Sequence, residues 1–82
     1  METIQIQSVG KVPAIPASSL WVDDIIVFNF GHLAKVTDVA KITKAFTTFI
    51  LFDYQTKSEC IRRFKTTRLV AVTSETYKRR AK

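Results

Sequence analysis

The sequence predicts a small all-β domain of about five strands. Of its 82 residues, 26 are Val, Ile or Thr and only 4 are Leu. Because side chains branched at Cβ are stiff and pack well on a pleated sheet, this bias favours strands over helices. Short apolar segments follow one another at roughly ten-residue spacing, a pattern typical of a small sheet that curls into a barrel. Apolar residues form 46% of the chain, which is enough for one compact core.

The first 19 residues are expected to form an extended arm or an edge strand. Ile4 and Ile6 alternate with glutamines, as in a strand with one exposed face. Pro13 and Pro16 disfavour a helix, because the residue before a proline avoids helical backbone. The barrel itself is expected to span residues 20–72.

A short turn is expected to lead into the barrel. Residues 18–24 have the composition of a single helical turn, which Ser18 or Ser19 would cap with its hydroxyl. From this turn, Leu20 and Trp21 are expected to tuck beneath the sheet, since a tryptophan in so small a domain usually fills the core.

Two strands with a tight turn between them are predicted next. Residues 25–30 are mostly apolar, and Gly31 supplies the positive φ that a tight turn requires. In the strand predicted over residues 33–42, the alternation fails once, because three positions rather than two separate Val36 from Val39. An extra residue in one strand would restore the alternation, so we expect a β-bulge near Thr37 and Asp38. A helix would also accept a three-residue step, but Thr37 and Thr43 weaken that alternative.

The strongest strand pattern lies at residues 46–54, where apolar side chains occupy both faces. A strand of this kind is buried on both sides or shared between two sheets, so we expect it to be central. A loop at residues 54–57 is expected to return the chain into a strand over residues 58–64. A short 3-10 turn at residues 65–67 is then predicted before the last strand, at residues 68–72.

The chain is basic, and half of its excess charge lies at one end. Thirteen Lys and Arg residues against seven Asp and Glu residues give a formal net charge of +6. Residues 73–82 carry four of these cations with a single glutamate and show no apolar periodicity, so we expect a basic tail in coil or a stub of helix. A net charge of this size attracts polyanions such as nucleic acids.

Several classes of protein are not expected. A single cysteine, Cys60, has no partner for an intramolecular disulfide. The chain shows neither a secretory signal pattern nor an apolar run long enough to span a membrane, so we expect a cytoplasmic protein without membrane contact. With one histidine, His32, and no ligand-spaced cluster or glycine-rich phosphate loop, we expect no metal, no cofactor and no catalysis.

The order of residues in the central part of the chain resembles a known family. The acidic start of the strand Asp24–Val27, the turn glycine Gly31, the three-residue valine step and the strand Thr48–Phe52 are similar to the pattern of SH3-like small barrels, in particular of KOW-type domains. Residues 62–72 resemble the short turn and closing strand of that family. The resemblance covers about residues 20–72, and a looser one links the chain to small bacteriophage proteins. It implies a barrel that binds peptides, RNA, DNA or another domain.

Basic side chains and one aromatic strand end are the candidate binding residues. Arginine offers phosphate a bidentate fork, and an exposed ring can stack on a base. The competing interpretation is that Phe64 lies in the core while the arginines cover the barrel surface and pair with Glu59, Asp38 or Asp53. The candidates are Lys35, Lys41, Lys44, Arg62, Arg63, Lys65, Arg68, Phe30, His32, Lys78, Arg79 and Arg80.

The leading hypothesis is a barrel that binds DNA or RNA through a basic face and the C-terminal tail. No recognition-helix pattern is present, so we expect no sequence readout. The alternative is a protein-interaction module that occupies an acidic surface of a partner, for instance a phage-encoded inhibitor or adaptor of a host protein. The same arginine-rich segment, residues 62–68, would serve either function, so composition leaves both hypotheses open.

Overall fold

The computed structural model describes residues 3–6, 10–28 and 31–80. Strands dominate, so the all-β class predicted from the sequence is confirmed. In chain order the elements are β1 (Thr3–Ile6), β2 (Gly10–Pro16), the 3-10 helix η1 (Ala17–Ser19), β3 (Ile25–Val27), β4 (Leu33–Ile42), β5 (Phe46–Asp53), β6 (Ser58–Lys65), β7 (Leu69–Ala71) and the helix α1 (Ser74–Arg80).

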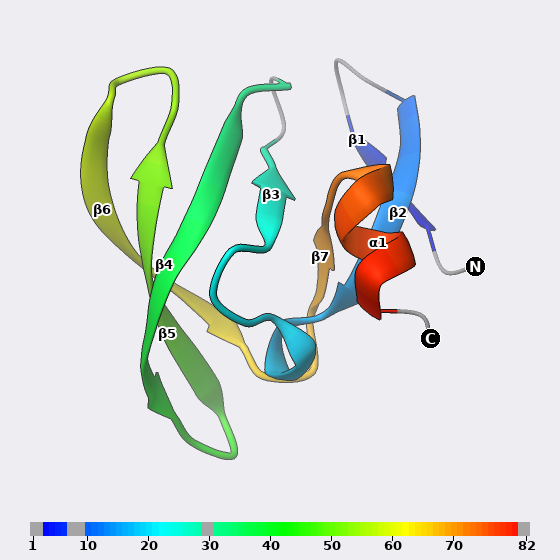
Figure 1. Cartoon of the computed structure of the whole chain (residues 1–82). Helices are drawn as coiled ribbons and strands as arrows, with labels where there is room; N and C mark the ends of the chain where they lie inside the picture. The colour runs from blue at the N-terminus through cyan, green and yellow to red at the C-terminus, as the bar shows by residue number, and fades with distance from the viewer. Residues whose placement is uncertain (1–2, 7–9, 29–30, 81–82) are drawn as a thin grey trace.

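The strands form two antiparallel sheets that lie next to each other (Figure 1). One sheet has the order β1-β2-β7 and the other the order β3-β4-β5-β6. A single bridge between Ile26 and Val72 links β3 to the end of β7. The described strands therefore follow one another from β1 to β6 across the molecule, with β1 and β6 at the two ends. The closed barrel of about five strands is not confirmed, because seven strands are described and their sheets do not close.

The N-terminal segment is part of the folded body. β1 pairs with β2, and β2 pairs with β7 on its other side, so β1 is an edge strand. Ile6 and Val12 pack against Ala71 in a small buried cluster. The proline-containing β2 also joins the sheet, where the Pro13 carbonyl accepts a hydrogen bond from the Val72 amide at 2.9 Å.

The long hairpin of β4 and β5 has the predicted bulge and the predicted central strand. The register between the two strands shifts between Val36 and Asp38, as expected from the valine spacing, and shifts again between Val39 and Lys41. β5 pairs with β4 on one side and with β6 on the other, which confirms that it is central. The predicted tight turn is also present, since Gly31 has a φ of 88°.

The main core lies between the two sheets. β5 contributes Phe49 and Leu51, which are fully buried, and β4 contributes Ala34 and Val36 on the same face. The second sheet and its connections complete this cluster with Ile15, Ala17, Leu20, Val70 and Val72.

The turn at residues 18–24 differs from the prediction. Leu20 is buried as expected, but Trp21 is 54% exposed, so its expected place beneath the sheet is wrong. The Trp21 amide donates to the carboxylate of the buried Asp24 at 2.8 Å, and this closes a turn from which the Trp21 side chain points into solvent. The serine cap is also wrong, because η1 follows Pro16 and has no side-chain capping hydrogen bond.

The connection before the last strand is a single hydrogen-bonded turn, in agreement with the short 3-10 turn predicted there. The Arg68 amide donates to the Lys65 carbonyl at 2.9 Å, and the described 3-10 helix, η1, lies beside this turn. The Ala17 amide donates to the Arg68 carbonyl at 2.8 Å, so the two segments are joined.

The C-terminal segment forms a docked helix. Thr73 caps α1, because its hydroxyl accepts the Thr76 amide at 3.3 Å, a typical N-terminal capping contact. The buried Thr76 hydroxyl accepts the Ile25 amide at 3.0 Å, and Tyr77 packs against the main core. Neither this helix nor η1, in the part of the chain that is described, is long and apolar enough to cross a membrane.

We expect Leu51→Ala to lower the free energy of unfolding by about 2–5 kcal/mol, because it opens a cavity in the main core. This is a large share of the roughly 5–15 kcal/mol that stabilises a small domain. The matched control is Ile61→Ala on the neighbouring strand, where the side chain is 71% exposed and the loss should stay below about 1 kcal/mol. Urea unfolding followed by circular dichroism measures both, and equal losses would contradict the assigned faces of the sheet.

Candidate nucleic-acid interface

The outer face of β4, β5 and β6 gathers several of the predicted basic residues. Residues directly opposite on neighbouring strands share a face of the sheet. Lys41 pairs with Thr48, and Thr48 pairs with Arg63, so these three residues form one row across the three strands. In the adjacent row Phe46 pairs with Lys65.

These rows lie at the end of the sheet where β4 turns into β5. All residues from 40 to 46 are exposed, and Figure 1 shows this hairpin end pointing away from the rest of the molecule. Lys44 lies in the turn itself. We call the set of Lys41, Lys44, Arg63 and Lys65 the basic tip. None of its four cations forms an ion pair with any residue that the structure describes.

The turn that carries Lys44 is held by several hydrogen bonds. The Thr43 amide donates to the Phe46 carbonyl at 2.8 Å, and the Phe46 amide donates to the Thr43 hydroxyl at 2.9 Å. The Thr66 hydroxyl donates to the Thr43 carbonyl at 2.8 Å, and the Thr66 amide donates to the Ala45 carbonyl at 3.1 Å. These contacts fasten the turn to the end of β6, so the basic tip has an ordered backbone.

Arg63 and Phe46 form the closest cation–π contact among the described residues. The guanidinium carbon of Arg63 lies 4.4 Å from the centre of the Phe46 ring. This contact orients the planar guanidinium while its N–H groups stay available for an anion. The sequence pattern indicates Phe46 only as a strand residue and does not reveal it as the ring that supports Arg63. Its place among the cations follows from its pairing with Lys65, and that pairing requires the strand register.

The rest of the outer face is less basic. The next row toward the other end holds Asp38, Ile50 and Ile61. Beyond it, Lys35 pairs across the strands with Phe52 and lies 3.8 Å from the Asp23 carboxylate. Lys35 is therefore separated from the basic tip and partly neutralised.

Two of the predicted arginines lie on the other side of the sheet. Arg62 pairs with the buried Phe49, so it is on the inner face, opposite to that of Arg63. Its guanidinium lies over the Phe28 ring at 5.4 Å, and that of Arg68 lies over the Phe64 ring at 5.6 Å. Phe64 packs against the core, as the competing interpretation expected.

The C-terminal cations are only partly available. Arg79 donates to the Oδ1 atom of the fully buried Asp24 at 2.6 Å, so its charge is already neutralised. Lys78 is exposed on the same helix. The side chain of Arg80 lies outside the described part of the chain.

Of the predicted aromatic strand end, the structure describes Phe28 and His32, whose rings are in contact. His32 stacks on Phe28 with ring centres 4.7 Å apart, and its Nε2 atom lies 3.7 Å from the Asp53 carboxylate. Phe30, the other candidate at this end, falls outside the described residues. Within the described residues, no three His, Cys, Asp or Glu side chains are grouped so that they could hold a metal ion.

Comparisons with known proteins identify no relative. No protein-family model, curated protein or solved structure matches the chain.

We expect Arg79→Ala to lower the free energy of unfolding by about 1–3 kcal/mol, because it removes a charged partner of a buried carboxylate. The loss should stay below the largest values for buried ion pairs, since the Arg79 side chain is half exposed and the Trp21 amide still binds Asp24. Lys78→Ala, one position earlier on the exposed side of α1, is the control and should change the stability little. Thermal unfolding of both variants measures the difference, and equal stability would rule out this ion pair as a structural contact.

Proposed function

We propose that the protein binds single-stranded DNA or RNA through the basic tip, without catalysis. The observation that carries this proposal is the row of Lys41, Thr48 and Arg63 across three strands, next to the pair of Phe46 and Lys65. It concentrates on an ordered hairpin end one exposed ring and four cations that form no ion pair with the described residues.

The basic tip offers two kinds of contact to a nucleic acid. Lysine and arginine neutralise phosphates and release their counterions, which favours binding without regard to sequence. A base can also stack on the flat guanidinium of Arg63, which itself rests on Phe46. Stacking needs an exposed base, so this arrangement favours single strands over duplexes.

Two other features agree with this choice. The described α-helix has seven residues and is docked on the sheet, so it has neither the length nor the freedom of a recognition helix. The helix also offers fewer available cations for nucleic-acid binding than its sequence predicts, because Arg79 is paired with Asp24. The relation to SH3-like barrels and the cytoplasmic location stay predictions from the sequence.

We expect the triple variant Lys41→Gln, Lys44→Gln and Lys65→Gln to lose roughly a hundredfold in affinity for a single-stranded oligonucleotide at low salt. Each phosphate contact contributes about 0.7 to the slope of log K against log salt, so the slope should fall from about 3 to about 1 in magnitude. Fluorescence anisotropy with labelled oligo(dT) and oligo(U), over a salt series, measures both quantities.

A matched control separates the basic tip from net charge. Lys11→Gln, Lys57→Gln and Lys78→Gln remove the same charge from three exposed positions outside the basic tip. This control should keep most of the affinity and the slope. Equal losses in the two triple variants, or no binding by the unchanged protein at low salt, would refute the proposed interface.

A charge-conserving substitution tests the stacking contact. Arg63→Lys keeps the cation but removes the guanidinium plane, so the salt slope should stay unchanged while the affinity for single strands falls about tenfold. Arg62→Lys, on the inner face of the same strand, is the control and should have no effect. An unchanged affinity of Arg63→Lys would show that phosphate attraction alone accounts for binding.

A further inference from the structure

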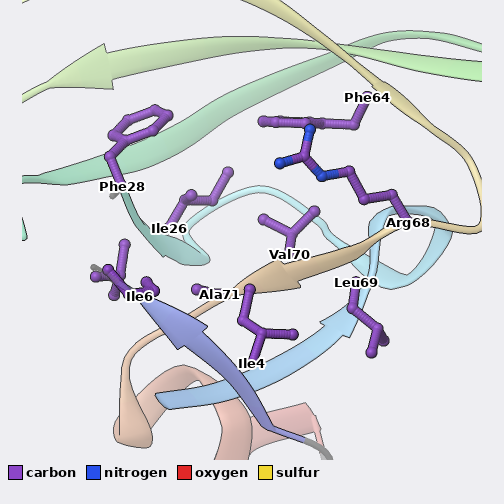
Figure 2. A pocket seen from close by; sticks show the side chains of 10 residues that line it. Ile4, Ile6, Ile26, Phe28, Phe64, Arg68, Leu69, Val70 and Ala71 are labelled. Atoms are coloured by element: carbon purple, nitrogen blue, oxygen red, sulfur yellow. The ribbon is translucent and has the colours of Figure 1, made fainter. Parts of the chain in front are cut away.

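A small cavity, lined mostly by apolar side chains and by Arg68, lies between β1, β3, β7 and the C-terminal end of β6. Its volume is about 80 Å³. Figure 2 shows β1 on one side of this cavity, with Ile4 and Ile6, and Phe64 of β6 on the other. Ile26, Phe28 and Val70 form part of its floor and wall. We call this cavity, together with the edges of β1 and β6 beside it, the open seam.

Both strands at the open seam have a free edge. Among the described strands, β1 has β2 as its one neighbour and β6 has β5 as its one neighbour. The backbone groups along such an edge can pair with an added extended chain. An apolar cavity beside two free edges has the layout of a site for a strand supplied by another molecule.

Two arginines give the open seam a definite charge. The guanidinium of Arg68 lies over the Phe64 ring, and Figure 2 shows its side chain reaching across the cavity toward that ring. Arg62, from the inner face of β6, lies over Phe28 on the opposite wall. No ion pair joins either arginine to an acidic residue of the described chain. Because each guanidinium is already oriented by a ring, it can donate two parallel hydrogen bonds to a carboxylate.

We propose that the open seam binds an extended acidic segment of a partner protein. A small aliphatic side chain of that segment would fill the cavity, its carboxylates would pair with Arg62 and Arg68, and its backbone would add to a free strand edge. This inference goes beyond the proposed nucleic-acid binding and does not depend on it, because Arg62 and Arg63 point to opposite faces of β6.

Size and charge argue against other occupants. A cavity that holds benzene has a volume of about 150 Å³, so the seam cavity is too small for an aromatic ring or a nucleobase. A second copy of the chain, with its own net charge of +6, would be repelled by Arg62 and Arg68. An acidic peptide meets neither objection.

Three synthetic peptides of about ten residues test the proposal on the full chain. Because residues two apart in a strand share a face, one peptide repeats Glu-Thr-Val-Thr, a second has Lys in place of Glu, and a third has Ser in place of Val. We call them the Glu-Val, Lys-Val and Glu-Ser peptides. We expect measurable binding of the Glu-Val peptide, and at least tenfold weaker binding of the other two, by fluorescence anisotropy at low salt. Equal binding of the Glu-Ser peptide would overturn the role of the cavity, and absence of Glu-Val binding would overturn the proposal as a whole.

Variants on the two faces of β6 provide the matched control. Arg62→Gln and Arg68→Gln should each weaken Glu-Val binding at least fivefold, whereas Arg63→Gln removes the same charge from the outer face and should leave it nearly unchanged. A thermal melt of each variant verifies that it is folded. In a two-dimensional amide NMR titration, the largest shifts should fall on residues 3–6 and 60–64. Equal weakening by Arg63→Gln, or shifts centred on the basic tip, would overturn the assignment to the open seam.

The nucleic-acid proposal and the peptide proposal can be refuted independently of each other. Loss of oligonucleotide binding in the Lys41, Lys44 and Lys65 variant, with Glu-Val binding retained, would support both surfaces. If the same variant lost both ligands equally, the peptide would be binding to the basic tip, and the open seam would be excluded as its site.

Discussion

The two register shifts in β4 are the feature on which the core and the outer face depend. With regular alternation, Asp38 would share the inward face of Val36, and Val39 would face solvent. The first shift instead turns Asp38 outward and brings Val39 against the core. The second shift keeps Lys41 on the outer face, in the same row as Arg63. Because bulges also bend and twist a strand, the same two irregularities curl the sheet around its apolar interior.

The local sequence pattern predicted most strands, whereas the features that it failed to predict depend on contacts between residues far apart in the chain. The branched residues located the strands from β3 to β7, and the spacing of Val36 and Val39 located the first bulge. The open sheets were not predictable in this way, because closure depends on which strand edges meet in space. Trp21 was misplaced because its backbone is bound by Asp24, a contact that apolar periodicity does not report.

The site shows the same division between local and long-range information. Because neighbouring residues of a strand face opposite ways, alternation alone is enough to separate Arg62 from Arg63, and the strand register agrees. The grouping of Lys41 with Arg63 required the register across three strands, which no local pattern contains. The capture of Arg79 by the buried Asp24 joins residues 55 positions apart, so composition wrongly counted this arginine as free. β6 thus presents one arginine to each of two surfaces. Arg62 lies over the Phe28 ring on one face, and Arg63 lies over the Phe46 ring on the other.

The position of β1 at the border of the sheet has a consequence for the motions of the molecule. It is held along one side by four residue pairs with β2, whereas β5 is held on both sides over its whole length. Local opening is easiest where the fewest backbone bonds and buried contacts must break. Amide hydrogens of β1 should therefore exchange with solvent through local fraying, while those of β5 exchange only when the whole domain unfolds. The edge strand that borders the cavity is thus held by few backbone pairs, and an added strand would stiffen it.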